Sequence, residues 1–266
     1  MKNNIILMKK LFYLTFVILI VFSCKNTVEK PKQNKIIKQD TVEVKNIPVE
    51  KPEYPSYLNI NFLMGKFDPS KHPEFVRIED KYTNKHNVYL DKKAYNAFLK
   101  MYDAAYKDGF KLLIVSATRP FYYQKGIWER NWAKRKNIKD PVRRAMDILK
   151  FSSMPGTSRH HWGTEIDLNV LENSYYATGE GKQIFDWMSE NAYKFGFCRP
   201  YTPGRPYGYN EEKWHWSYKP VSKIYTRFAK ENMKDEYISG FKGAETAKKI
   251  QVTKKYILGI NKKCYK

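Results

Sequence analysis

Two short segments of this chain are dense in histidine and carboxylate, and they constrain how the protein can fold. The first contains His160, His161 and Asp167, and the second contains Glu212 and His215. The chain has five histidines, and three of them fall within these two segments. Two imidazoles and one carboxylate can bind zinc and leave a coordination position open for water, while a second carboxylate can move the proton of that water. Together the segments supply what a hydrolytic zinc site requires, so the fold has to bring them together.

The N-terminal segment has the pattern of an export signal. Lys9 and Lys10 precede twelve residues, 11–22, that carry no charge. A helix needs roughly 20 apolar residues to span a bilayer, whereas a shorter run suits the apolar core of a secretory signal. A serine followed by Cys24 ends the run and resembles a lipoprotein processing box. We predict that residues 1–23 are a lipoprotein signal peptide and that Cys24 becomes acylated. An ordinary cleaved signal or a short uncleaved anchor would give the same pattern.

The rest of the chain divides by composition into three parts. Residues 24–57 are rich in Lys, Glu, Asn and Gln, contain four prolines and have no aromatic residue before Tyr54. This composition cannot bury enough apolar surface to fold, so we predict a flexible tether. Residues 58–232 are predicted to form the catalytic domain. Residues 233–266 contain nine lysines against three acids and are predicted to form a basic, partly helical C-terminal extension.

The formal net charge of +22 bears on possible partners. A basic balance of this size raises nucleic acid as a candidate, but export argues against it. An anionic wall polymer or an anionic lipid surface fits an exported protein better, and a solvated lysine-rich surface is the alternative. We expect no nucleic-acid partner, a membrane attachment through the lipid, and a monomer in the cell envelope, either periplasmic or at the cell surface.

The cysteines leave one question open. If Cys24 is acylated, Cys198 and Cys264 remain. An even pair in an oxidising compartment can form a disulfide. Two unpaired thiols are the alternative, and the sequence does not decide between them.

Hydrophobic periodicity predicts short strands mixed with helices. Apolar residues at helical spacing, or a proline in the first turn, indicate helices, whereas short apolar or alternating runs indicate strands. The expected helices are 90–107, 122–136, 142–150, 183–195 and 225–233, and the expected strands are 110–117, 166–170 and 213–218. Because these elements lack regular βαβ spacing, we predict an α+β fold.

Three motifs in the right order make the chain resemble a known family. They are Ser158-x-His160-x-x-Gly163-x-x-x-Asp167, Glu212-x-Trp214-His215, and Ser116-x-x-Arg119 followed by Gln124. These motifs resemble the VanY-type zinc D-alanyl-D-alanine carboxypeptidases, whose superfamily also holds the D-Ala-D-Ala dipeptidases and the signalling domain of hedgehog proteins. The resemblance runs from about residue 58 to 228. It implies a central, mostly antiparallel sheet flanked by helices, with a zinc cleft.

The resemblance also implies roles for individual residues. His160, Asp167 and His215 would bind zinc, and Glu212 would be the catalytic acid and base. The chemistry of the residues agrees, because a carboxylate beside the water can pass its proton to the departing amine. In an ideal strand Glu212 and His215 would face opposite sides. We therefore expect Glu212 in the loop before the strand, or turned inward by a bulge. His161 is the alternative ligand to its neighbour His160 and is expected to lie in the pocket or behind the ligands.

The remaining site residues concern the substrate. Arg119 is expected to bind the terminal carboxylate of the peptide, because a guanidinium matches two carboxylate oxygens; a surface ion pair is the alternative. Ser116, Gln124 and Ser158 could hydrogen-bond the substrate backbone. Trp214 could line the cleft or belong to the core.

Three positions depart from the family pattern. Glu165 stands where alanine is usual, Lys213 where proline is common, and Pro120 where a small hydroxyl residue is common. None of them removes a ligand, so they put the substrate in doubt rather than the reaction class. The resulting hypothesis is a zinc carboxypeptidase that removes the terminal D-alanine from peptidoglycan stem peptides. The alternatives are an L,D-carboxypeptidase or endopeptidase on the same polymer, and a wall-binding lipoprotein that holds zinc without turnover.

Overall fold

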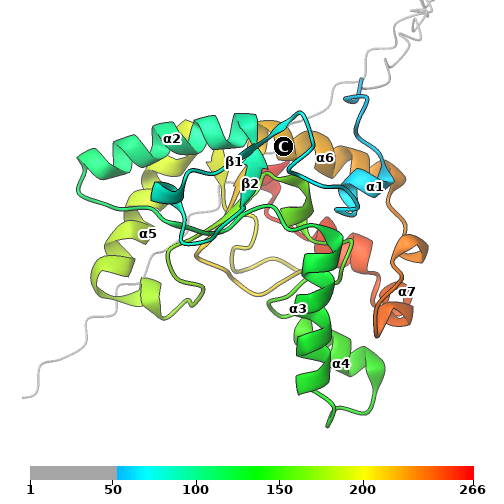
Figure 1. Ribbon diagram of the computed structural model, residues 1–266. Coiled ribbons are helices and arrows are strands. Elements are labelled where there is room, and N and C mark those ends of the chain that lie inside the picture. Colours follow the sequence, from blue (N-terminus) through cyan, green and yellow to red (C-terminus); the bar gives the residue numbers. More distant parts are fainter. Residues whose placement is uncertain (1–52) are drawn as a thin grey trace, which may run out of the picture. The chain divides into compact units, whose positions relative to one another are not determined.

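A computed structural model describes residues 53–266, which belong to one compact unit that begins near residue 51 (Figure 1). The predicted signal peptide, Cys24 and most of the predicted tether lie outside the described residues. The helices are α1 Ile60–Leu63, α2 Lys92–Lys107, α3 Phe121–Lys134, α4 Pro141–Ile148, α5 Gly179–Asn191, α6 Lys219–Asn232 and α7 Ala247–Ile250. The strands are β1 Phe75–Arg77, β2 Tyr89–Asp91, β3 Ile114–Ser116, β4 Glu165–Leu168, β5 Phe197–Cys198 and β6 His215–Tyr218.

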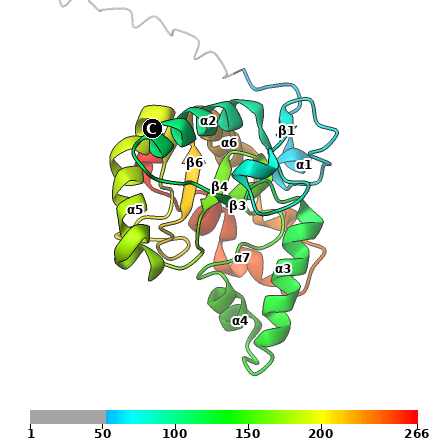
Figure 2. The ribbon, with the colours of Figure 1, turned by 60° about the vertical axis from the view of Figure 1, so that its left-hand side comes forward.

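A four-stranded antiparallel sheet of order β3-β4-β6-β5 forms the centre, and β1 and β2 make a separate antiparallel pair. Figure 2 shows β6, β4 and β3 next to one another, with α5 toward the β6 side and α3 toward the β3 side. Among residues 53–266, helices alternate with short strands and pack against this sheet. The prediction of an α+β fold with an antiparallel sheet flanked by helices is confirmed.

One face of the sheet packs against α2 and α5. Ile166 and Leu168 of β4 and Trp216 of β6 are buried in the same apolar cluster as Phe98 of α2 and Trp187 of α5. These strand residues are two apart or cross-strand partners, which places them on the same side of the sheet. The alternate residues of β4 and β6 therefore face the other way.

Helix α2 shows how the sequence forms this layer. The Asp91 carboxylate accepts hydrogen bonds from the backbone N–H groups of Lys93 and Ala94, which begins the helix. Helical spacing places its apolar residues on one buried face. Gly109 follows the helix with a φ of 86°, a conformation that glycine adopts without strain.

The second core lies among α1, α3, α4, α6 and the C-terminal segment. Ile250, Val252 and Ile257 are buried in it, and a disulfide joins Cys198 of β5 to Cys264. The predicted separate extension, 233–266, is thus part of the domain: its lysines face solvent while its apolar residues complete the core. The lysine-rich composition of the segment concealed the apolar residues that are buried in the core.

The domain also begins earlier than the sequence predicts. Tyr54 donates a hydrogen bond to Glu231 and packs edge-on against Phe228, and the hydroxyl groups of Tyr57 and Tyr225 lie 3.0 Å apart. The last residues of the predicted tether therefore contact α6. Among residues 53–266, no helix has both the length and the apolar character needed to cross a membrane.

Candidate metal centre and substrate cleft

Three side chains from three elements converge at the polar face of the sheet. His160 comes from a 3-10 turn, η2 Arg159–Trp162, whereas Asp167 lies on β4 and His215 on β6. The Nε2 atom of His160 lies 3.2 Å from Asp167 Oδ2 and 3.2 Å from His215 Nδ1. His215 Nδ1 lies 3.0 Å from Asp167 Oδ1. All three side chains are buried.

Local sequence fixes the orientation of His160. The Ser158 hydroxyl accepts a hydrogen bond from the backbone N–H of His160 and caps the turn. Gly163 ends the turn with a φ of 71°, and a Cβ atom at this position would lie 2.3 Å from the ring of Phe75. Ser158 and Gly163 of the motif therefore shape the backbone that presents the ligand.

Hydrogen bonds to the far ring nitrogens decide which nitrogens can bind a metal. His160 Nδ1 lies 2.8 Å from the carbonyl of Ala117, which can only accept, so Nδ1 carries the proton and Nε2 keeps a lone pair. His215 Nε2 lies 2.8 Å from Glu165 Oε2. Burial opposes ionisation of Glu165, but the charge of Arg159 and hydrogen bonds from His215 and Ser217 outweigh it and lower the pKa to about 2. Glu165 thus accepts from Nε2 and leaves Nδ1 free to bind a metal.

This arrangement fits a divalent metal with a mixed nitrogen and oxygen ligand set. Two imidazole lone pairs and a carboxylate meet within hydrogen-bond distance, and Asp167 Oδ1 has no hydrogen-bond donor as long as His215 Nδ1 carries no proton. A tetrahedral zinc ion with ligands at roughly 2.0–2.2 Å would separate its ligand atoms by about 3.3 Å. The observed separations of 3.0–3.2 Å come close to this value. Three buried acceptors that face one another require a cation between them.

Without a metal, a proton takes the place of that cation. Burial lowers the pKa of His215, but its hydrogen bonds to Asp167 and Glu165 outweigh burial and raise the pKa to about 9. Burial lowers the pKa of His160 to about 4. Burial also opposes ionisation of Asp167, yet the two histidines hold its pKa well below the usual range. In the metal-free cluster His215 is therefore protonated on both ring nitrogens at neutral pH.

Glu165 is part of a buried polar network behind His215. Its Oε1 accepts from the Ser217 hydroxyl at 2.6 Å and lies 3.1 Å from the Arg159 guanidinium. Arg159 in turn donates to the Thr226 hydroxyl on α6 at 2.8 Å. A carboxylate hydrogen-bonded to a ligand histidine fixes the ring and raises its basicity. The sequence singled out Glu165 as an extra carboxylate but did not reveal its partners, because Ser217 is placed by the β4–β6 register and Arg159 by the packing of η2.

Glu212 lies beside the ligands in the loop that precedes β6, one of the two placements that the sequence predicts. Its Oε2 is 3.5 Å from His215 Nδ1. Burial raises the pKa of Glu212 to about 8. A carboxyl group with such a pKa is suited to take up and release a proton near neutral pH.

A cavity of about 470 Å³ opens beside the ligands, and Arg119, Asp167, Glu212 and Trp214 all line it. Arg119 follows β3, and its backbone N–H donates to the carbonyl of His160 at 3.1 Å. Its Nε is buried without a hydrogen-bond partner. Arg119 is only partly buried, and its unused Nε donor in the cleft wall fits the role of carboxylate ligand that the sequence suggests.

His161 faces away from the ligand cluster. Its Nδ1 donates to the carbonyl of Arg119, and its Nε2 accepts from the backbone N–H of Gly156 at 3.0 Å. Burial lowers the pKa of His161 to about 3, so the ring is neutral. His160 therefore lies in the cluster, whereas His161 hydrogen-bonds the backbone carbonyl of Arg119.

Three predicted substrate-binding residues lie elsewhere. Gln124 is buried in α3, and its amide donates to the carbonyl of Ser153 at 2.8 Å. Ser158 is buried as the cap of η2. Ser116 lines a different cavity of about 770 Å³, which shares Arg119 with the cleft. Direct substrate contact by Gln124 and Ser158 stays a prediction: neither residue lines the cleft, and Gln124 Nε2 and the Ser158 hydroxyl bind backbone groups, whereas Gln124 Oε1 has no hydrogen-bond partner among the described residues.

Comparison with known proteins identifies the family. Residues 87–222, just over half of the chain, match the model of the family described as VanY, D-alanyl-D-alanine carboxypeptidase. The chain belongs to the VanY family. The matched segment contains the three ligand residues together with Arg119 and Glu212.

Two curated relatives and one solved structure are similar to parts of this chain. An Enterococcus faecalis D-alanyl-D-alanine carboxypeptidase is 31% identical over 132 residues, 47% of this chain and 47% of the relative. Bacillus subtilis YodJ, which bears the name of a carboxypeptidase, is 29% identical over 175 residues, 61% of this chain and 59% of the relative. The chain therefore spans about half the length of the curated relatives it matches. The solved structure of VanYB in complex with D-alanine-D-alanine is 24% identical, with a TM-score of 0.45 over 58% of this chain and 83% of that one.

Proposed function

We propose that this VanY-family protein is a zinc carboxypeptidase that removes the terminal D-alanine from peptidoglycan stem peptides ending in D-Ala-D-Ala. The observation that carries the proposal is a single cleft that holds three converging metal-binding atoms, the Glu212 carboxyl group and the Arg119 guanidinium. The family description and the named relatives support the choice of substrate.

The residues divide the reaction among them. A zinc ion held by His160, Asp167 and His215 would polarise the scissile carbonyl and lower the pKa of a water molecule. Glu212 takes the proton of the attacking water and delivers it to the departing amine. Arg119 pairs with the terminal carboxylate of the peptide and so sets which amide bond lies at the metal.

The products of stem-peptide digestion test this proposal. The full chain, loaded with zinc, should convert a pentapeptide ending in D-Ala-D-Ala to a tetrapeptide, as measured by mass spectrometry. Conversion of tetrapeptide to tripeptide alone would instead identify an L,D-carboxypeptidase, and cleavage within a cross-link an endopeptidase. Retention of zinc with no turnover of any of these would indicate a wall-binding protein.

A second experiment tests the role of Arg119. Arg119→Lys keeps the charge but loses the paired donors, so kcat/KM on the free-acid peptide should fall by about tenfold or more. The peptide with an amidated C-terminus should be a poor substrate of the unmutated protein. Equal rates on the free-acid and amidated peptides would show that the protein does not bind a terminal carboxylate.

We further propose that the protein is exported and anchored to the envelope through Cys24. The disulfide between Cys198 and Cys264 supports an oxidising compartment, where such bonds persist. Metabolic labelling with a fatty acid should mark the protein, and Cys24→Ala should abolish the label and release the protein from membranes. Labelling that survives this substitution would refute the assignment of Cys24.

A further inference from the structure

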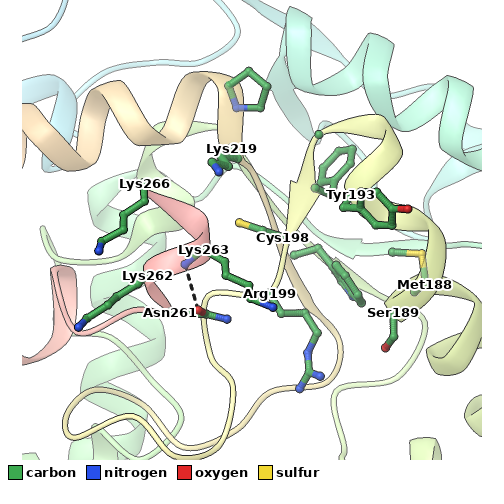
Figure 3. Close-up of a pocket in the computed structure, with 14 residues that line it drawn as sticks. Met188, Ser189, Tyr193, Cys198, Arg199, Lys219, Asn261, Lys262, Lys263 and Lys266 are labelled. Carbon is green, nitrogen blue, oxygen red and sulfur yellow. Dashed lines mark hydrogen bonds between the residues drawn. The ribbon is translucent and has the colours of Figure 1, made fainter.

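A third cavity, of about 820 Å³, lies away from the metal-binding atoms, at the β5 edge of the sheet. Its walls come from the end of α5 and the turn that follows, from β5, from the start of α6, and from the C-terminal turn. Figure 3 shows the lysines of the C-terminal turn on one side and Tyr193 and Met188 on the other, with Cys198 between them. We call it the basic cavity after five of its lining residues, Arg199, Lys219, Lys262, Lys263 and Lys266.

The positive charges of the basic cavity are largely uncompensated. No acidic side chain is among the residues that line it. Arg199 is paired with Glu211 at 2.5 Å. The lysines that form ion pairs within residues 53–266 lie elsewhere, so the four lysines of the cavity have no carboxylate partner there. Like charges that gather around a concavity repel one another, and a bound anion relieves this repulsion.

The backbone that carries these lysines is held in place. The backbone N–H of Asn261 donates to the carbonyl of Pro200 at 2.9 Å, and the Asn261 side chain accepts from the backbone N–H of Lys263 at 3.0 Å. The disulfide fastens Cys264 to Cys198 on β5. The charges are therefore presented by a fixed turn rather than by a loose tail, which lowers the entropy that a ligand has to overcome.

We propose that the basic cavity binds a linear, phosphate-bearing anionic polymer. The site is concave, so it suits a chain that enters a recess better than a flat lipid surface. Its unpaired cations are lysines, which bind phosphate as point charges without the paired geometry of an arginine fork. Residues 247–266 contain seven lysines and no acid, and three of these lysines line the cavity, so this segment would attract such a polymer.

Binding of labelled inorganic polyphosphate to the full chain, measured by fluorescence anisotropy, tests the proposal. Lys262→Gln with Lys263→Gln should weaken binding roughly ten- to thirty-fold and should reduce the dependence of affinity on salt concentration. Lys249→Gln with Lys254→Gln is the matched control. It removes two exposed charges from the same C-terminal region but none from the cavity, so we expect less than a threefold change.

Three results would overturn the proposal. They are equal losses in the two double variants, tighter binding of polyglutamate than of polyphosphate of matched length, and binding to anionic lipid vesicles alone. Because none of the substituted lysines lines the metal cleft, hydrolysis of a small soluble peptide should stay unchanged in both variants. The polymer test is therefore independent of whether the proposed peptidase activity is found.

Discussion

The two faces of strands β4 and β6 are both buried, yet they differ completely in chemistry. On one face Ile166 pairs across the strands with Trp216 in an apolar core. On the other, Asp167 pairs with His215, and Glu165 pairs with Ser217. The apolar face stabilises the folded state because its side chains are removed from water. The polar face avoids destabilising the folded state only if every buried charge has a partner. A single register of β4 and β6 therefore provides both the core and the ligand cluster.

The largest effect is expected from Glu212, which contacts the cluster without belonging to its ligands. Glu212→Gln should retain the metal while kcat falls by about 10²–10⁴, because an amide cannot take the proton from water. Elemental analysis and steady-state kinetics on the same preparation measure both quantities. His215→Ala, as the contrasting variant, should lose the metal as well. Loss of metal from Glu212→Gln would mean that Glu212 is itself a ligand.

The apolar face should affect stability and leave the chemistry alone. Ile166→Ala removes a fully buried side chain and should cost about 2–5 kcal/mol in the free energy of unfolding. Below the unfolding transition the affinity for zinc should change by less than about threefold. Ile166→Val, with a smaller cavity, should cost about 0.5–1.5 kcal/mol. Denaturant unfolding and metal titration separate the two effects, and a large loss of affinity in the valine variant would contradict the division of the faces.

Glu165 should couple metal affinity to the buried network. Glu165→Gln should lower zinc affinity by about 10–100-fold, because His215 loses its carboxylate partner. It also leaves Arg159 buried without a counter-charge, which lowers stability. The double variant Glu165→Gln with Arg159→Met removes that second effect, so stability should recover while zinc affinity stays low. Recovery of both together would show that Glu165 acts only on folding.

The smallest effect concerns protons. In the metal-free protein His215 has a pKa of about 9 and so carries both ring protons at pH 7. A metal ion that binds Nδ1 displaces one of them, so affinity should rise about tenfold per pH unit until about pH 9 and level off above it. Calorimetry in buffers of different ionisation enthalpy should find release of about one proton. The Glu212→Gln variant is the better sample, because Glu212, with a pKa of about 8, can add a proton of its own.

What the sequence determines is the set of reactive groups and their immediate backbone. The spacing from Ser158 to Asp167 places a capped turn, a left-handed glycine and an alternating strand in succession, and each is a local property. Local reasoning also limited Glu212 to the loop before its strand or to a bulge, because an ideal strand would have turned it away from His215. The family motifs pointed to the same three residues that converge in the structure, His160, Asp167 and His215.

Tertiary structure decided how these groups are paired. Nothing local indicates that Glu165 faces His215 or that His161 holds the Arg119 carbonyl, since each of these contacts joins segments distant in the sequence. Arg159 is only six residues from Glu165, but their ion pair depends on how the turn η2 packs against β4. The sequence likewise did not decide whether Cys198 and Cys264 form a disulfide, and the fold brings them together in one. The C-terminal residues looked like a charged appendage because charge is visible in a sequence. Their burial depends on a surface that only the folded domain provides.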